Sequence, residues 1–472
     1  MKITKKILTC FAFLLSAFLF FSCVSVPEPT TGEEKKRYEE PKKDPKVEFA
    51  LNLEKALKNG DYEAALSFFE NLSEELKNDI RIKNLKLSIL ISSKKLKEAN
   101  IYAEELEKDY PEDMDVLYSQ VILAQAENNQ KKKNIYLEKI LRKNPADVRA
   151  LTEQGSDFYT KRRYNEARRK FLEAYKADSK AVNALIGLAR VNYMQQKLDQ
   201  AESNLNTVLE LEEENSFALA ELARVKSETN RMYEALNDIK KAIELSPDIA
   251  NHWMDLASYN LQIGRKEEAR TAFGKVIDLE PDSYVAYIYR AGLNDDLGYK
   301  EEALKDYIKV CEIYPAYFYA FEGAGILFLE KKDWQNANTA FIKALAKSPE
   351  SYHYAIIAAF CYHKMNKKFE AKDFMQKYLK TIDRTKKVNE YTMCRLFIDF
   401  AGDTDAYNKA TMEKDNTKKG RMFFYIALFY ELTNKPALAE KCYAEVLSIP
   451  NPAFFEYRLA ENVMNAKLGK AE

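Results

Sequence analysis

The sequence repeats with a period of 34 residues, and this period constrains the fold more than any other feature. Counted in steps of 34 in both directions from Ala269, ten of twelve positions hold alanine, with no insertion or deletion. The ten are Ala65, Ala99, Ala167, Ala201, Ala235, Ala269, Ala303, Ala337, Ala371 and Ala439, while Lys133 and Asp405 occupy the other two positions. A fixed period of this length is typical of an array of stacked helical hairpins.

Other columns in the same frame explain the period. If each repeat begins at residue 46 plus a multiple of 34, position 32 is often a helix-ending proline, as in Pro111, Pro145, Pro247, Pro281, Pro315 and Pro349. Position 15 often holds a residue that tolerates the left-handed conformation of a turn, as in Gly60, Gly264, Gly298, Asn128, Asn230, Asn366 and Asn434. Two antiparallel helices of about 13 residues are expected between these stops. Small residues at position 8, such as Gly155 and Gly325, are expected where the two helices cross closely.

The pattern resembles the tetratricopeptide repeat family. The match is best over residues 250–283, through Trp253, Leu256, Ala257, Gly264, Ala269, Phe273 and Pro281. The resemblance covers 46–453, with strong repeats over 148–385 and weak ones over 46–147 and 386–419. It implies an all-α fold, a right-handed α-solenoid of about 12 helix-turn-helix repeats, closed by a capping helix and tail over 454–472.

The chain begins with a segment typical of export. Residues 1–22 combine three early lysines with an apolar run too short to span a membrane comfortably. The run ends at Cys23 in a sequence that resembles a bacterial lipoprotein signal, which implies acylation of that cysteine, for example with palmitate. The alternative is an ordinary signal peptide with a cysteine near its end. Residues 23–45 are polar and rich in proline, glutamate and lysine, which predicts a flexible tether.

The predicted binding surface lies on one side of the first helix of each repeat. Positions 2, 5, 9, 12 and 13 share that side, which in the resembled family lines a concave groove for ligands. Its residues predict a basic and aromatic stretch, a neutral one, an acidic one and an aromatic one. The candidates for binding a protein or peptide partner are Arg149, Tyr159, Arg190, Tyr193, Arg224, Asn251, Asp295, Tyr319, Glu322, His353 and Phe360. The alternative is that about half of the charged ones are merely solvated.

Two groups of polar residues inside the repeats favour structural interpretations. The run Lys131 to Lys133 interrupts the alanine column and is expected to form a solvated surface turn. Position 11, aromatic in the resembled family, holds Asn192, Asn260 and Asn294. These asparagines could form a hydrogen-bonded ladder, but ordinary self-satisfied polar residues are the favoured interpretation.

Catalysis and cofactors have little support in the sequence. The three histidines lack a metal-ligand spacing, and we find neither a phosphate-binding loop nor a nucleophile elbow. Lysine plus arginine equals aspartate plus glutamate at 73 each, which argues against nucleic acid as a main partner. The later cysteines are expected to be core residues, with a Cys361–Cys394 bridge as the less favoured alternative. No enzyme activity, no cofactor and no metal are expected.

These observations favour a lipid-anchored scaffold or adaptor of the bacterial cell envelope, whose groove binds a protein or peptide partner. The outer membrane or the periplasmic face is the expected location. A second hypothesis, drawn from the aromatic residues of repeats 284–385, is a carrier or accessory protein for a small hydrophobic ligand.

Overall fold

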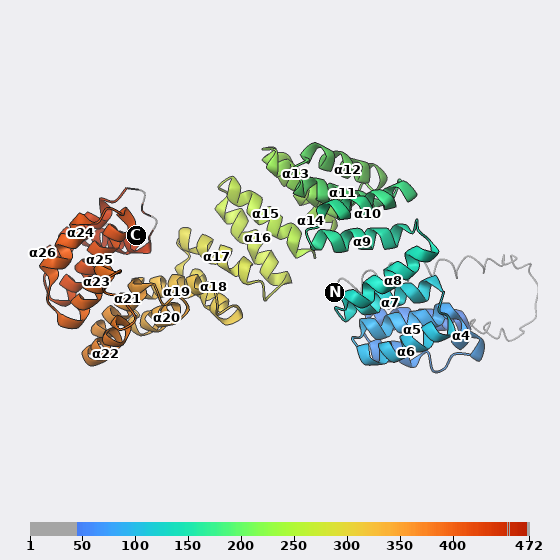
Figure 1. Ribbon diagram of the computed structural model, residues 1–472, viewed down its shortest axis with the longest axis horizontal. Helices are drawn as coiled ribbons and strands as arrows, with labels where there is room; N and C mark the ends of the chain where they lie inside the picture. Colours follow the sequence, from blue (N-terminus) through green and yellow to red (C-terminus); the bar gives the residue numbers. More distant parts are fainter. Residues whose placement is uncertain (1–44, 451, 453, 470–472) are drawn as a thin grey trace, which may run out of the picture. The chain divides into compact units, whose positions relative to one another are not determined.

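The computed structural model of the protein describes residues 45–450, 452 and 454–469, and over these residues it contains helices and no strand. The predicted signal segment, Cys23 and nearly all of the tether lie outside the described residues. The chain divides into two compact units, one ending at Glu213 and the other beginning at Glu214. The predicted all-α fold of stacked helical hairpins is confirmed within each unit (Figure 1).

The first unit consists of hairpins whose partners are consecutive in sequence. In the well-formed repeats the first helix has 13 residues and the second has 14, close to the predicted lengths. The helices are α2 (Pro45–Lys58), α3 (Tyr62–Ser67), α4 (Glu74–Asn78), α5 (Ile80–Ser92), α6 (Leu96–Asp109), α7 (Met114–Ala126), α8 (Gln130–Lys143), α9 (Val148–Thr160), α10 (Tyr164–Ala177), α11 (Val182–Met194) and α12 (Leu198–Leu211).

The second unit continues the same plan and adds a final helix. Its helices are α13 (Ser216–Glu228), α14 (Met232–Leu245), α15 (Ala250–Gln262), α16 (Lys266–Leu279), α17 (Tyr284–Asp296), α18 (Lys300–Ile313), α19 (Phe318–Glu330), α20 (Trp334–Lys347), α21 (Tyr352–Lys364), α22 (Lys368–Leu379), α23 (Val388–Asp399), α24 (Asp403–Met412), α25 (Asn416–Leu432), α26 (Pro436–Leu447) and α27 (Phe455–Lys467). None of the described helices has the length and apolar character needed to cross a bilayer.

The turn inside each hairpin has the same backbone conformation throughout. Position 15 has a positive φ in all twelve repeats: Gly60, Lys94, Asn128, Arg162, Gln196, Asn230, Gly264, Gly298, Lys332, Asn366, Phe400 and Asn434. Glycine or asparagine predicts this conformation in seven of them, but lysine, arginine, glutamine and phenylalanine adopt it as well. The packing of the two helices therefore imposes the turn even where the side chain disfavours it.

The alanine column is buried inside the hairpins. Nine of its ten alanines are completely buried, and Ala439 is nearly so. The small residues at position 8 leave room for a large ring from the second helix. A Cβ atom placed on Gly155 would lie 2.7 Å from the ring of Phe171, and one on Gly325 would lie 2.8 Å from the ring of Phe341. These contacts explain why small residues recur at position 8.

The expectation of a solvated turn at Lys133 is wrong. Lys133 lies within α8 and is 5% exposed, and its ammonium group lies 2.9 Å from both Glu153 and Asp157 on α9. Burial by itself lowers the pKa of Lys133, but the two carboxylates outweigh it and the pKa lies above its ordinary value. A lysine replaces alanine here because its charge is neutralised by the next helix.

Candidate functional site

The candidate site is the first-helix surface, meaning the side of the first helices that carries positions 2, 5, 9, 12 and 13. In the first unit Arg149 is exposed, and its guanidinium lies 4.0 Å from the ring centre of Tyr118. Arg190 and Tyr193 are half-buried. Tyr159 is also half-buried, with its ring 5.7 Å from that of Tyr164. The basic and aromatic stretch is therefore only partly open to solvent.

In the second unit, Arg224 is part of an ion-pair network. Its guanidinium lies 2.9 Å from Glu221 on the same helix and 2.8 Å from Asp255 on α15. Burial by itself lowers the pKa of Arg224, but the two carboxylates raise it well above the ordinary value. The guanidinium thus joins two neighbouring first helices, and binding a partner would require it to exchange these contacts.

At position 2 of the first helices in the second unit, three side chains form an exposed row, whereas Val285, Lys387 and Arg421 are half-buried and His353 is buried. Asn251 is exposed, and Tyr319 is 52% exposed although its ring lies 4.1 Å from that of Phe318. Phe217, at the same position of α13, is 47% exposed. Sequence reasoning did not single out Phe217, although its place in the repeat gave the signal. An exposed aromatic residue of this kind is typical of contact hot spots.

The acidic stretch is occupied by the C-terminal helix of the same unit. Arg458 of α27 donates from Nε to Glu330 over 2.7 Å and from Nη2 to Asp295 over 3.0 Å. Asn462, one turn further on, donates to Glu330 over 2.9 Å, and Lys300 lies 2.7 Å from Asp295. Two of the carboxylates that sequence spacing places together are therefore neutralised within the unit.

The last three candidates, Glu322, His353 and Phe360, have side chains that are half-buried or buried in the second unit. Glu322 accepts a hydrogen bond from Tyr354, and burial raises the pKa of its carboxyl group. His353 is buried, and burial, with a smaller effect of Arg421, lowers its pKa to about 3. Phe360 is buried in edge-to-face contact with Trp334, at 5.9 Å between ring centres. The predicted aromatic stretch thus contributes mainly to the core, apart from Tyr319.

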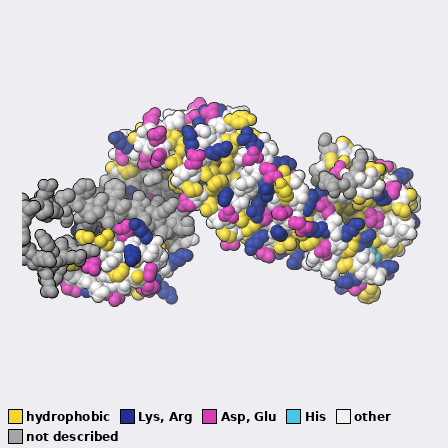
Figure 2. Space-filling model, turned by 180° about the vertical axis from the view of Figure 1, so that it is seen from behind, with side chains coloured by type: hydrophobic (Ala, Val, Ile, Leu, Met, Phe, Trp, Pro, Cys, Tyr) yellow, Lys and Arg dark blue, Asp and Glu magenta, His cyan; other side chains and the backbone are white. Residues whose placement is uncertain are grey.

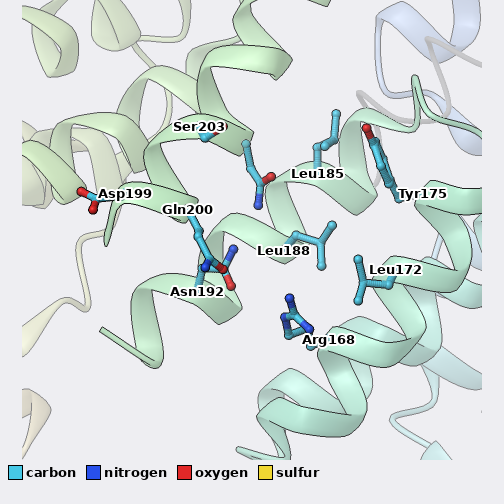
Figure 3. A pocket seen from close by; sticks show the side chains of 10 residues that line it. Arg168, Leu172, Tyr175, Leu185, Leu188, Asn192, Asp199, Gln200 and Ser203 are labelled. Atoms are coloured by element: carbon cyan, nitrogen blue, oxygen red, sulfur yellow. The ribbon is translucent and has the colours of Figure 1, made fainter. Parts of the chain in front are cut away.

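The first unit also contains a cleft of about 340 Å³ where α10, α11 and α12 meet (Figure 3). It is lined by Arg168, Leu172, Tyr175, Leu185, Leu188, Asn192, Asp199, Gln200, Ser203 and Asn204. The Oδ1 atom of buried Asn192 and the Nε atom of Arg168 have no hydrogen-bond partner among the described residues. Asparagine at position 11 fills less space than the aromatic ring usual at this position, which helps to keep the cleft open.

The asparagines at position 11 bond within their own hairpins. Asn260 donates to the carbonyl of Leu256 over 3.0 Å, and Asn294 donates to Asp306 over 3.1 Å. Asp306 also accepts hydrogen bonds from the Nε and Nη2 atoms of Arg290, at 2.8 and 2.7 Å. The bonds of Asn260 and Asn294 therefore stay within separate hairpins and form no ladder between repeats. This agrees with the favoured interpretation, in which these asparagines are ordinary self-satisfied polar residues.

Metal and redox chemistry find no assembled site in the part of the chain that the structure describes. No cluster of three or more histidine, cysteine or acidic side chains there could hold a metal ion. Cys361 and Cys394 are buried free thiols, and burial raises the pKa of Cys361 to about 12. The less favoured Cys361–Cys394 bridge is therefore not formed.

Helical hairpins stacked in sequence order define an α-solenoid repeat protein. The family model described as tetratricopeptide repeat matches residues 152–211 and 221–284. These two stretches of the chain therefore match the tetratricopeptide repeat, as the resemblance implied, and arrays of such repeats are scaffolds for interactions with other proteins. Comparison with curated proteins gave no match.

Solved structures with similar hairpins share little sequence with this chain. MamA is 24% identical, covering 34% of this chain and 95% of its own, with a TM-score of 0.32. The pilF protein of Pseudomonas aeruginosa is 18% identical, covering 44% and 94%, with a TM-score of 0.39. YrrB, described as a TPR protein with an unusual peptide-binding site, is 19% identical, covering 39% and 96%, with a TM-score of 0.31. Scores at this level carry no functional argument.

Proposed function

We propose that this protein is a lipid-anchored, non-catalytic scaffold of the bacterial cell envelope that binds a protein or peptide partner on its first-helix surface. The observation that supports it best is the row at position 2 in the second unit. Phe217, Asn251 and Tyr319 remain exposed there while the inner columns of the same hairpins are closed. Figure 2 shows Lys and Arg side chains intermixed with Asp and Glu side chains on the face of the molecule that it displays, and the first-helix surface carries both signs of charge as well, for example Arg224 and Asp295. Such a surface suits a partner with complementary charges and an apolar anchor.

A crosslinking pull-down from membranes tests the binding surface. The bait is the full chain, either wild type or carrying Phe217→Ala with Tyr319→Ala. Tyr233→Ala is the matched control, because Tyr233 is 73% exposed but lies on a second helix. We expect the double variant to lose at least tenfold in partner recovery, while the control recovers as much as the wild type. Equal recovery by all three would show that partners do not use the row.

The membrane anchor rests on the sequence of the N-terminal segment. Several acyl chains on Cys23 would hold the array at the membrane, since more than one chain is needed for stable attachment. Growth with an alkyne analogue of palmitate should label the wild-type protein and the Cys10→Ser control. The Cys23→Ser variant should not be labelled. Label retained on that variant would refute acylation at this cysteine.

A second candidate function is that of a carrier for a small ligand with apolar character. The cleft between α10 and α12 favours it, because leucine and tyrosine side chains lie there beside unpartnered polar atoms (Figure 3). Native mass spectrometry of the purified chain separates the two candidates. A carrier should retain a small non-covalent molecule that the Leu188→Trp variant, in which the cleft is filled, does not retain.

A further inference from the structure

Helix α27 closes the end of the array, and it also makes contacts of the kind that a bound partner helix would make. A terminal helix that only closes the array needs to contact only the last hairpin, formed by α25 and α26. Helix α27 packs against both of these helices and also reaches α19, three hairpins earlier. The helix therefore lies along the first-helix surface of the second unit.

The middle of α27 is held to that surface by charge. Arg458 binds Asp295 of α17 and Glu330 of α19, at 163 and 128 residues away in sequence. Asn462 follows one turn later on the same side of α27 and shares Glu330 with Arg458. Because these carboxylates lie at positions 12 and 13 of their repeats, they belong to the predicted groove. A guanidinium and an amide spaced by four residues are thus complementary to this part of it.

The first turn of α27 is held mainly by burial. Phe455 packs against Phe341 at 6.1 Å and against His353 at 6.0 Å, between ring centres. Glu456 is completely buried and bonds to Arg421, at 3.3 Å, and to Tyr425. Leu459 is buried as well. This turn is the firm attachment of the helix.

The remainder of α27 is attached less firmly. Residues 463–465 are half-buried, and residues 461, 462 and 466–469 are exposed. The side chain of Arg458 is 31% exposed. The carboxylates are more buried than the guanidinium, with side-chain exposures of 13% for Asp295 and 17% for Glu330, so they require a cation at this place. An incoming helix that presents a guanidinium keeps these carboxylates paired, but to take the place of Arg458 it must also lift Leu459 and Ala460, which are buried directly after it. The asymmetry favours local opening from the C-terminal end.

We propose that the surface formed by Asp295 and Glu330 is a binding site for an amphipathic helix that presents an arginine and, four residues later, an amide side chain, and that α27 is its built-in occupant. A partner helix of this chemistry displaces the end of α27 and takes its place. The proposal rests on the proposed function, because it names the partner class for one part of the first-helix surface. It also predicts that this part of the surface is closed in the isolated protein.

A fluorescent peptide with the sequence of residues 454–469 tests the proposal by anisotropy. It is titrated with the full chain as wild type, as Arg458→Glu and as Arg458→Glu with Asp295→Asn and Glu330→Gln. Arg395→Glu is the control for charge reversal, since Arg395 pairs with Asp399 on α23. We expect Arg458→Glu to bind the peptide at least tenfold more tightly than the wild type and the control. The triple variant, and a peptide carrying Arg458→Glu, should bind at least tenfold more weakly than that.

Hydrogen exchange of the backbone amides of α27, measured on the same variants, shows whether α27 has left the surface. Every result of the peptide titration can then be interpreted. If Arg458→Glu leaves α27 protected and gains no peptide binding, α27 is a permanent cap and the proposal is overturned. If α27 loses protection and the peptide still does not bind, the surface does not recognise such a helix, and the proposal is also overturned. Should Arg458→Glu fail to fold, Arg458→Gln replaces it with the same expectations. The partner pull-down with Phe217 and Tyr319 variants has a separate readout, so its failure is distinguishable from failure here.

Discussion

The ammonium group of Lys133 lies 2.9 Å from the carboxylate of Asp157, and this pair joins the second helix of one hairpin to the first helix of the next. Lys133 occupies a position that holds alanine in ten of the twelve repeats. Its charge is accommodated because Glu153 lies at the same distance on the other side. The alanine column thus tolerates a long side chain when the neighbouring hairpin supplies opposite charge.

The Lys133→Met variant should be less stable than the wild type by about 1–3 kcal/mol in the first unit, because two partly buried carboxylates lose their cation. Urea unfolding followed by circular dichroism measures the change. Lys131→Met is the control, since Lys131 is exposed on the same helix and its loss should change stability by less than about 0.5 kcal/mol. Equal effects of the two variants would contradict the assigned role of the ion pair.

The Gly325→Ala variant should destabilise the second unit by about 1–3 kcal/mol, because its new methyl group would overlap the fully buried ring of Phe341. Gly292→Ala is the matched control on a neighbouring first helix, where a Cβ atom meets nothing within 4 Å. The control should be unchanged or up to about 1 kcal/mol more stable, owing to the helix propensity of alanine. Thermal unfolding of both variants measures the difference, and a neutral Gly325→Ala would show that the ring can move away.

Replacing Asn192 by leucine should stabilise the first unit by about 1 kcal/mol. The change removes a buried amide oxygen that has no hydrogen-bond partner among the described residues and adds apolar contact. Asn294→Leu provides the contrast: the Oδ1 atom of Asn294 also lacks a partner among the described residues, but its Nδ2 atom donates to buried Asp306, and loss of that bond should destabilise the second unit by about 1–2 kcal/mol. Urea midpoints of the two variants should therefore shift in opposite directions. A shift to lower urea for Asn192→Leu would indicate that the amide is satisfied in solution.

Acidification should destabilise the second unit through His353. Burial and the nearby Arg421 lower the pKa of its imidazole from 6.5 to about 3. Because the folded-state pKa lies below the unfolded one, the contribution to stability is complete above about pH 6.5 and is lost as the pH falls towards 3. Between pH 7 and pH 4.5 the unfolding free energy of the wild type should fall by about 2 kcal/mol more than that of His353→Gln. The carboxyl groups titrate in both proteins, so equal falls would exclude His353 as the cause.

Much of the fold could be predicted because the decisive contacts are local. A small residue at position 8 meets a ring of the second helix across a single turn, as Gly155 meets Phe171, so the spacing of these residues in the sequence indicates the packing directly. The six prolines at position 32 likewise mark helix ends, and the structure ends those helices two residues before each proline. Position 15 could not be predicted in every repeat from its residue type. Phe400 adopts the left-handed turn only because the hairpin around it requires that conformation.

The candidate site was predicted less completely. Asn251 and Tyr319 share position 2 and are both exposed, since helical periodicity decides which side of a helix a residue lies on. His353 occupies the same position and is buried, because the aromatic side chain of Phe455 lies against it. The period carries no information about a segment that lies outside the repeats.

The sequence by itself determined the repeated hairpin, its length, its closely packed columns and the sides of its helices, because each of these depends on residues within one or two turns of one another. Only the tertiary structure decided which parts of the first-helix surface remain open. Arg458 and Asp295 are 163 residues apart, and their attraction has no signature in either local sequence. Contacts between residues so far apart in sequence depend on the position in space to which the successive hairpins carry the chain. That position is the sum of the rotations and shifts at every packing interface between the hairpins.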